Sequence, residues 1–169
     1  MEKISIVING VGGAGKDTLI SLLQDKYKIK NVSSIAPIKA LAKMMGWQGE
    51  KTDKARKFLS DLKAITTEYN DYPTNYLLEE QQGFIADNNQ IMFVHIREPK
   101  EIEKFVNRSK TKTITLLIRP REELIQKHFG NSSDDQVENY RYDYVFNNDR
   151  SLEEIRPIWQ EFFAKIMEI

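Results

Sequence analysis

Short apolar runs alternate with longer segments of helical spacing along the 169-residue chain. The first run spans residues 4–8 and ends at Asn9 and Gly10, a pattern typical of a central parallel strand buried on both faces. β-branched and aromatic residues predict further strands at 90–96, 113–118 and 142–146, with a weaker one at 32–35. The pattern therefore predicts a sheet of about five strands.

Between the predicted strands, apolar residues recur with the period of an α-helix, as in residues 19–27 and 58–65. Strands that alternate with helices favour right-handed crossovers, hence an α/β fold with a parallel sheet and helices on both faces. Residues 37–89 depart from this alternation, because they hold three helical segments in a row without a strand. We expect this all-helical insert to cover a substrate.

The last predicted helix begins near Ser151, which has Glu154 at capping-box spacing. Pro157 interrupts the segment, since proline lacks an N–H group and clashes with the preceding turn. We therefore expect residues 151–155 to form a separate turn and the helix to begin at Pro157. The apolar residues predicted on one face are Leu152, Ile155, Trp159, Phe162 and Ile166.

Composition narrows the classes of function. The 25 basic residues equal the 25 acidic ones, so bulk charge gives no reason to expect a nucleic-acid polymer or a membrane as partner. The chain has no cysteine, which excludes disulfides, thiolate zinc sites and thiol nucleophiles and fits a reducing compartment. Its start is neither a signal peptide nor a membrane span. We expect a cytoplasmic protein with one domain, residues 1–169.

A glycine-rich loop follows the first predicted strand. Residues 10–16 read GVGGAGK and satisfy the G-x-x-x-x-G-K pattern of a phosphate-binding loop between a strand and an amphipathic helix. Backbone N–H groups of such a loop surround a β-phosphate, and Lys16 reaches the β- and γ-phosphates as a catalytic group. The predicted ATP-binding residues of the loop are Gly10, Gly12, Gly13, Ala14, Gly15, Lys16, Asp17 and Thr18.

Asp17 stands where this pattern normally has serine or threonine, and Thr18 follows it. The resulting G-K-x-T is the pattern of nucleoside monophosphate kinases and their relatives, in which the threonine contacts phosphate. Asp17 would then be near enough to bind Mg²⁺ through water. A plain interaction of its carboxylate with the helix dipole is the alternative.

Five segments in order resemble the phage-type deoxynucleoside monophosphate kinases and their relatives, the animal phosphomevalonate kinases. They are GKDT (15–18), SSIAPIKALAKMMGW (33–47), IREPKEIEKF (96–105), SDDQVENY (133–140) and RYDYVFNNDRSLEEI (141–155). The resemblance covers nearly the whole chain. It implies a three-layer P-loop NTPase fold in a single kinase domain, with the helical insert at 37–89 binding the acceptor and a short lid at 119–141. It also implies Mg²⁺-dependent transfer of the ATP γ-phosphoryl group to a nucleoside or deoxynucleoside monophosphate.

Transfer between two anionic groups requires cations in the cleft. Arg97 follows the third predicted strand and matches the family's V-R arginine, so the resemblance implies a catalytic group that binds the acceptor phosphate. A salt bridge with Glu98 or Glu101 is the alternative. Lys39 and Arg56 would face the acceptor from the insert, although Arg56 equally suits a solvated charged face.

Arg119 and Arg121 follow the fourth predicted strand, where the lid begins. Related kinases use one arginine here to stack on adenine and another to reach the transferred phosphoryl group. We assign Arg119 to ATP and Arg121 to catalysis, and the reverse assignment is open. Arg141 closes the lid and is predicted to bind the acceptor, with a salt bridge to Asp143 or Asp149 as the alternative.

His95 stands where the family has an aspartate that would organise Mg²⁺. A neutral imidazole is a poor ligand for this cation, so Mg²⁺ must rely on phosphates, waters and Asp17. His95 also permits two other interpretations, which are a regulator with weakened catalysis and a buried, hydrogen-bonded histidine. Ala36 and Arg150 depart from the family pattern as well, and His128 is expected on the lid or its flank.

Two other functions accompany the leading one. The first is a kinase for a non-nucleotide phosphate acceptor, in the manner of phosphomevalonate kinase. The second is a catalytically weak nucleotide-binding regulatory protein. The expected partners are ATP and a small phosphorylated acceptor, and the oligomeric state is open, a homodimer included.

Overall fold

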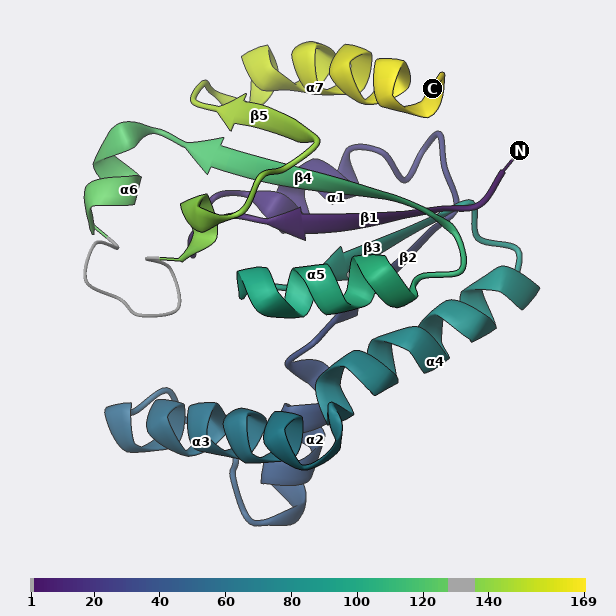
Figure 1. Ribbon diagram of the computed structural model, residues 1–169. Coiled ribbons are helices and arrows are strands. Elements are labelled where there is room, and N and C mark those ends of the chain that lie inside the picture. The colour runs from purple at the N-terminus through teal and green to yellow at the C-terminus, as the bar shows by residue number, and fades with distance from the viewer. Residues whose placement is uncertain (1, 128–135) are drawn as a thin grey trace.

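The computed structural model describes residues 2–127 and 136–169. Five parallel strands form one sheet in the order β2-β3-β1-β4-β5 (Figure 1). They are β1 (Ile4–Asn9), β2 (Ile29–Ser33), β3 (Ile91–His95), β4 (Lys112–Pro120) and β5 (Tyr144–Asn148). The predicted parallel sheet is confirmed, although β2 begins before the predicted residues 32–35 and β5 runs past 142–146.

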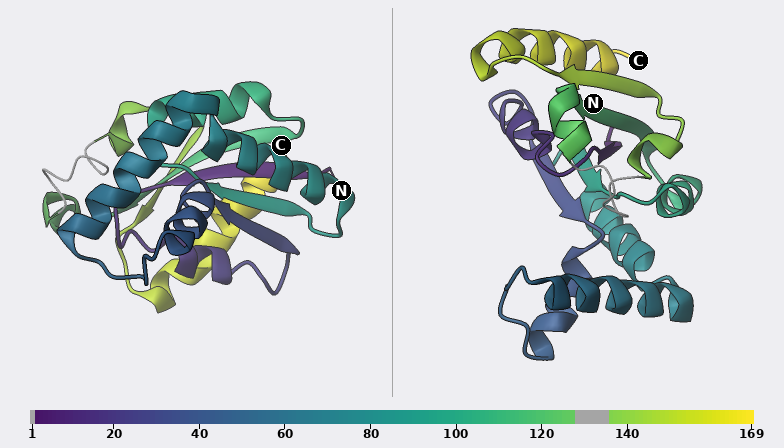
Figure 2. Two further views of the ribbon diagram at one scale, coloured as in Figure 1. Left: turned by 90° about the horizontal axis from the view of Figure 1, so that it is seen from below. Right: turned by 90° about the vertical axis from the view of Figure 1, so that its left-hand side faces the viewer.

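Helices cover both faces of the sheet and complete a three-layer α/β fold (Figure 2). They are α1 (Lys16–Ser21), α2 (Ala36–Met44), α3 (Asp53–Asn70), α4 (Tyr72–Ala86), α5 (Pro99–Arg108), α6 (Glu122–Lys127), the 3₁₀ turn η1 (Val137–Asn139) and α7 (Leu152–Met167).

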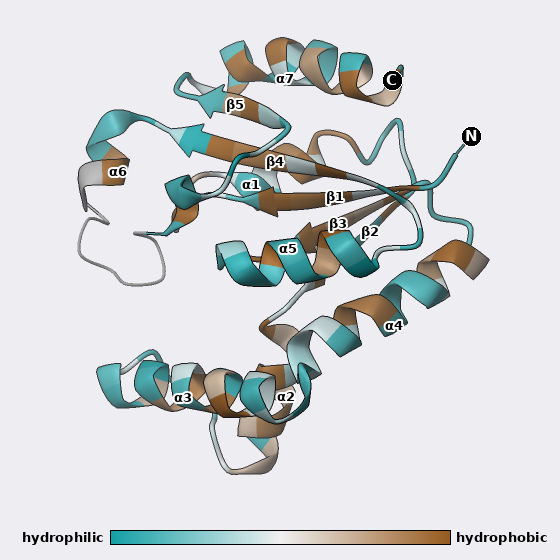
Figure 3. Ribbon diagram, in the orientation of Figure 1, coloured by the Kyte–Doolittle hydropathy of each residue, from teal (hydrophilic) through white to brown (hydrophobic). Residues whose placement is uncertain are grey.

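Strand β1 shows why the apolar runs are continuous. Ile6 and Ile8 pack in the core that contains residues of α1 and α7, whereas Val7 packs in the core that contains residues of α4 and α5. Because alternate side chains of a strand point to opposite faces, a strand covered on both faces is apolar throughout. Figure 3 accordingly shows β1 and most of β4 as hydrophobic segments, whereas β5 at the edge of the sheet has hydrophilic residues as well.

Helices α2, α3 and α4 form the insert expected at residues 37–89 (Figure 1). α2 and α3 project beyond the sheet, while α4 returns along it. Ala55 is the one buried residue of α3, and Ile65 is 63% exposed. The helical spacing of 58–65 thus marks a helix that covers no core. Within the described ranges, no helix is both long and apolar enough to cross a bilayer.

The prediction of a break at Pro157 is wrong, because α7 is continuous from Leu152 to Met167 with the proline inside it. The Ser151–Glu154 capping box is formed and fixes the helix start. Apolar residues on both sides of the proline are buried against the core, and their packing offsets the missing hydrogen bond. The buried residues of α7 are Ile155, Trp159, Phe163 and Ile166, and the partly buried Phe162 packs against the same core. Leu152 is 51% exposed, so it was wrongly placed on this face.

Helix α1 is shorter than the helical spacing of residues 19–27 suggests, since it ends at Ser21. The carbonyl oxygen of Leu19 accepts a hydrogen bond from the indole Nε1 of Trp159 at 2.8 Å, and that of Leu22 accepts one from Nε2 of Gln160 at 3.2 Å. Side chains of α7 therefore satisfy carbonyl groups at the end of α1, which holds the phosphate-loop helix against the C-terminal helix.

Candidate functional site

The loop between β1 and α1 has little space for side chains at two of its glycines. Gly15 has a left-handed conformation with φ of 89°. A Cβ atom at Gly10 would lie 2.6 Å from the carbonyl oxygen of Ile118, and one at Gly15 would lie 2.5 Å from Nδ2 of Asn148. The backbone of β4 therefore leaves no room for a Cβ atom at Gly10, while at Gly15 the left-handed backbone and the side-chain amide of Asn148 together favour glycine. The strand–loop–helix context of the motif is confirmed, and ATP binding remains a prediction.

Asn148 at the end of β5 holds the loop in place, because its Nδ2 donates to the carbonyl oxygen of Ala14 at 2.8 Å. Sequence reasoning missed this residue, whose one signal was an Asn-Asn-Asp run after the fifth strand. Lys16 folds back over the loop, and its Nζ donates to the carbonyl oxygens of Gly10 at 2.8 Å and Val11 at 3.4 Å. The lysine cation thus lies on the loop that would surround a phosphate.

Asp17 begins α1 beside Lys16 and extends into solvent, with its side chain 90% exposed. Thr18 is also exposed. Mg²⁺ in kinase sites usually keeps several waters and takes one or two carboxylates besides the phosphates, so an exposed Asp17 fits water-mediated binding. No group of three His, Cys, Asp or Glu side chains within 2–127 and 136–169 could hold a metal by itself. A magnesium ion here would depend on nucleotide phosphates.

His95 at the end of β3 is largely buried. Its Nε2 lies 2.7 Å from Oδ1 of Asn31 and 3.9 Å from Oδ1 of Asp17. Because the amide oxygen can only accept, Nε2 carries the proton. Burial lowers the pKa of His95, and the Asp17 carboxylate opposes this shift in part. The imidazole is therefore neutral at neutral pH, which supports the interpretation of a hydrogen-bonded histidine.

Arg97 follows β3, which is the strand next to β1 in the sheet. In their parallel register Ile8 lies opposite His95, so the phosphate loop and Arg97 start at adjacent strand ends. The carbonyl oxygen of Arg97 accepts a hydrogen bond from Nδ2 of Asn9 at 3.0 Å. Open α/β sheets bind ligands at this carboxyl edge. The structure thus brings the predicted acceptor arginine to the same edge as the loop.

Two ion pairs join the insert to α5. Lys63 of α3 lies 2.8 Å from both carboxylate oxygens of Glu98, and Lys104 of α5 lies 2.7 Å from Oδ1 of Asp71, which separates α3 from α4. Glu101 accepts a further hydrogen bond from Lys104 at 3.0 Å. Hydrogen bonds to these two acids raise the pKa of Lys104. Glu98 and Glu101, the predicted alternative partners of Arg97, thus bind lysines.

A cavity of about 730 Å³ lies between α3, the first turn of α5 and η1. Lys63, Lys100 and Lys104 line it together with glutamates and small polar residues, and within 2–127 and 136–169 none of its lining residues is aromatic. This volume suits a small-molecule ligand. The cavity begins at Glu98, directly after Arg97, so it extends the carboxyl edge of the sheet toward the insert.

The two predicted lid arginines have different partners. Arg119 at the end of β4 binds Glu138 of η1 with both ends of its guanidinium, from Nε to Oε1 at 3.1 Å and from Nη2 to Oε2 at 2.7 Å. These hydrogen bonds raise the pKa of Arg119. Arg121 donates from Nε to the carbonyl oxygen of Asp149 at 3.1 Å. Arg121 thus contacts the residue that follows the loop-holding Asn148 at the end of β5.

The remaining cations are less closely gathered. Lys39 on α2 and Arg56 on α3 are exposed on the insert, and their acceptor roles remain predictions. The predicted lid at 119–141 includes residues 128–135, which lie outside the described residues, as does His128.

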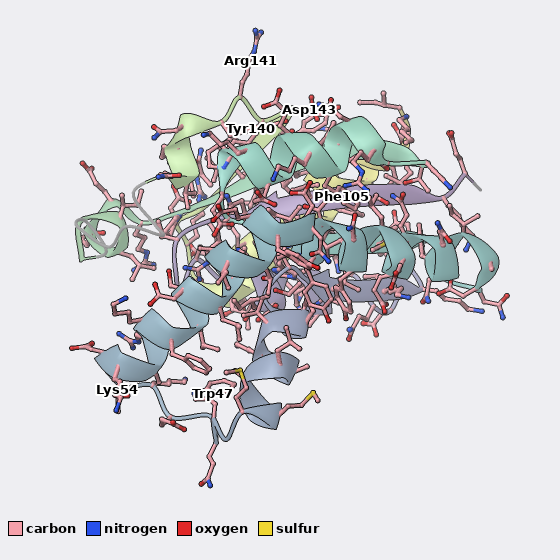
Figure 4. All side chains as sticks on the ribbon, turned by 60° about the horizontal axis from the view of Figure 1, so that its bottom comes forward. Trp47, Lys54, Phe105, Tyr140, Arg141 and Asp143 are labelled. Atoms are coloured by element: carbon pink, nitrogen blue, oxygen red, sulfur yellow. The ribbon has the colours of Figure 1, made fainter. Side chains whose placement is uncertain are left out.

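Arg141 is not brought to the other predicted site residues. Its side chain points away from the molecule, at the opposite end from Trp47 and Lys54 of the insert (Figure 4). The neighbouring Tyr142 is turned inward and hydrogen-bonded to Asn9, and alternate side chains of an extended segment point in opposite directions. The structure therefore gives no support to an acceptor-binding role for Arg141.

The sheet order, the glycine loop and the helices on both faces define the fold of the P-loop kinases. Solved structures match this fold over nearly the whole chain. Dephospho-CoA kinase from Campylobacter jejuni matches with a TM-score of 0.56 and 15% identity, over 98% of both chains. TT1252 from Thermus thermophilus has a TM-score of 0.55 and 20% identity over 98% of both chains. Shikimate kinase from Acinetobacter baumannii has a TM-score of 0.53 and 14% identity, over 99% of this chain and 94% of that one.

No protein-family profile and no curated protein sequence matches this chain. The structural matches therefore establish the fold class, and the resemblance to phage-type kinases rests on the sequence segments alone. The reaction must be inferred from the residues at the carboxyl edge of the sheet.

Proposed function

We propose that the protein is an ATP-dependent kinase that transfers the γ-phosphoryl group to the phosphate of a nucleoside or deoxynucleoside monophosphate. The observation that carries the proposal is the placement of the phosphate loop and Arg97 at the ends of adjacent strands β1 and β3. Lys16 would bind the transferred group, and Arg97 would bind the acceptor phosphate. Phosphoryl transfer depends on such positioning and charge neutralisation more than on covalent chemistry by the protein.

The titratable groups at this edge favour a phosphate acceptor over a hydroxyl acceptor. A hydroxyl group needs a general base to remove its proton, whereas a phosphate is already ionised at neutral pH. Glu98, the carboxylate next to Arg97, is bound to Lys63 through both of its oxygens. A phosphate acceptor requires only cations, which Arg97 and Lys16 supply.

Mg²⁺ would be held by the nucleotide phosphates and through water by Asp17, and its charge would neutralise the β- and γ-phosphates. The chain's own residues would do the rest. Lys16 would hold the γ-phosphate against the loop, and Arg97 would orient the acceptor oxygen for in-line attack. Insert closure would exclude water during transfer. The cytoplasmic location and the oligomeric state remain predictions.

The test is ADP production from ATP and Mg²⁺ with a panel of ribo- and deoxynucleoside monophosphates. Acceptor-dependent turnover should appear and fall by on the order of a hundredfold or more in Lys16→Ala. Lys165→Ala removes an exposed lysine of α7 and serves as the matched control, with turnover unchanged. ATP binding without turnover on any acceptor would overturn the proposal and favour the nucleotide-binding regulator.

A non-nucleotide phosphate acceptor is the second candidate, and one observation favours it. Among the described residues, the cavity next to Glu98 is lined mostly by lysines, glutamates and small polar residues and by no aromatic ring, so these residues offer no surface on which a base could stack. Phosphomevalonate and sugar phosphates therefore belong in the same acceptor panel. Turnover confined to them would replace the nucleotide assignment while preserving the kinase.

A further inference from the structure

Asn9, the last residue of β1, uses its whole side-chain amide inside the protein. It is completely buried. Its Oδ1 accepts from the backbone N–H of Gly10 at 2.9 Å, and its Nδ2 donates to the carbonyl oxygen of Arg97 at 3.0 Å and to the hydroxyl of Tyr142 at 2.9 Å. One side chain thus joins the first residue of the phosphate loop, the acceptor arginine and the segment that leads into β5.

Tyr142 extends this connection toward η1. Its hydroxyl accepts from Asn9 and donates to the carbonyl oxygen of Val137 at 2.7 Å. Burial raises the pKa of Tyr142 to about 12, so the hydroxyl keeps its proton and remains a donor. The next residue, Glu138, binds Arg119. A continuous set of contacts therefore runs from Arg97 to the arginine at the end of β4.

We propose that Asn9 and Tyr142 are positioning residues that hold Arg97 in register with the phosphate loop during phosphoryl transfer. The proposal rests on the kinase function proposed above, because it assigns Arg97 to the acceptor phosphate. A shift of about 1 Å between reacting groups can reduce turnover by roughly a hundredfold, so a fixed Arg97 main chain has a direct chemical consequence.

The hydrogen-bonding requirements explain why asparagine is needed at position 9. The site demands one acceptor for Gly10 and two donors for Arg97 and Tyr142, which a primary amide supplies. Aspartate would supply no donor, and leucine of similar shape could bond none of the three groups. Sequence reasoning used Asn9 only as the end of a strand.

The first test is Tyr142→Phe with Tyr140→Phe as its matched control. The two rings are in edge contact at 5.1 Å, and the Tyr140 hydroxyl makes no hydrogen bond among the described residues. Tyr142→Phe should lower kcat/KM for the acceptor by about tenfold while the Kd for ATP changes by less than about twofold. Tyr140→Phe should leave both unchanged. If Tyr142→Phe weakened ATP binding as much as it lowered kcat/KM for the acceptor, or changed neither, the proposal would be overturned.

The second test is Asn9→Ser, alone and combined with Tyr142→Phe. A serine hydroxyl can still accept from Gly10 but is too short to reach Arg97 and Tyr142 together. Because the two residues act as one unit, the double variant should lose little more acceptor kcat/KM than Asn9→Ser alone. Fully additive losses would show that Asn9 and Tyr142 act separately and would contradict the proposal. Circular dichroism would check that each variant is folded.

An independent measurement separates failure of this proposal from failure of the kinase assignment. In ¹H–¹⁵N spectra of the intact protein, Tyr142→Phe should move the amide signals of Gly10 and of Glu98, whose nitrogen is bonded to the Arg97 carbonyl. Tyr140→Phe should leave both in place. If the wild type turns over no acceptor, the kinase assignment fails, and unmoved Gly10 and Glu98 signals would overturn the link through Asn9 as well.

Discussion

The phosphate loop and the helical insert are held by different kinds of interaction. The loop is surrounded by buried groups, since Gly10 and Gly15 approach neighbouring strands too closely for a side chain and Asn9 is completely buried. Helix α3 of the insert buries only Ala55, and two ion pairs of partly exposed side chains join α3 and the residue after it to α5 and its N-cap. Buried hydrogen bonds resist exchange with water, whereas exposed pairs contribute roughly 0–1 kcal/mol each. The loop is thus built for one geometry, and α3 can shift at small cost, whereas α4 is anchored in the core through Leu77 and Phe84.

The largest effect on catalysis is expected from removing Arg97, the cation at the carboxyl edge of the sheet. Arg97→Ala should reduce acceptor kcat/KM by on the order of a hundredfold or more, because it removes the positive charge that we assign to the acceptor phosphate. Its ATP affinity should stay within about threefold. Arg56→Ala, which removes an exposed cation of the insert, should cost only a few-fold. Steady-state kinetics with ATP and the acceptor both varied would measure these losses. Equal losses of kcat/KM in Arg97→Ala and Arg56→Ala would contradict the expected difference between the sheet edge and the insert.

Glycine substitutions sharpen the same contrast in the loop. Gly15→Ala adds a Cβ atom 2.5 Å from Nδ2 of Asn148 at a left-handed φ of 89°. Gly49 has nearly the same φ of 91°, and nothing lies within 4 Å of its Cβ position, so Gly49→Ala isolates the backbone strain. We expect Gly15→Ala to weaken ATP binding by roughly tenfold or more and Gly49→Ala to leave it unchanged. Calorimetric titration with ATP would measure this, and similar affinities would contradict the steric account.

Removing the ion pair between Lys63 and Glu98 tests whether α3 of the insert can shift without affecting the phosphate loop. Lys63→Met keeps the aliphatic stem but removes the charge that lies 2.8 Å from both Glu98 oxygens. The KM for the acceptor should rise by up to about fivefold, with the Kd for ATP unchanged, because an isolated pair at a partly exposed site contributes little. Raising the ionic strength should narrow the difference between variant and wild type. A change in ATP affinity of the same size would contradict the separation of the two regions.

The smallest expected effect is the pH dependence of stability. Burial lowers the pKa of His95 below its usual 6.5, so the unfolded chain binds this proton more readily than the folded one. The contribution of neutral His95 to the free energy of unfolding is complete above about pH 6.5. It declines as the pH falls from there toward the lowered pKa of the folded state. His95→Gln should therefore lose less stability than the wild type between about pH 7.5 and about pH 5.5 in urea unfolding. If the free energy of unfolding changed equally with pH in the variant and the wild type, the result would contradict this account.

The fold and the loop were largely readable from sequence, whereas the arrangement around them was not. Continuous apolar runs predicted β1, β3 and β4 closely, because strands that are buried on both faces consist mainly of apolar residues. Pro157 misled the prediction of α7, since tertiary packing on both sides of the proline outweighed a local rule. Arg141 was predicted to close the lid and bind the acceptor, yet its side chain points away from the site while the neighbouring Tyr142 is turned inward. The direction in which a side chain points depends on which neighbouring side chain is buried, and the spacing of residues in the sequence does not reveal this.

The sequence by itself determined the class of fold, the phosphate loop with Lys16, and the position of Arg97 after the third strand. These features follow from periodicity and glycine placement within a few residues. Only the tertiary structure decided what holds them together. Asn9 binds a tyrosine 133 positions away, and Asn148 binds a loop 134 positions away. Such partners meet because β4 lies between β1 and β5 in the sheet, a long-range arrangement that no local pattern contains.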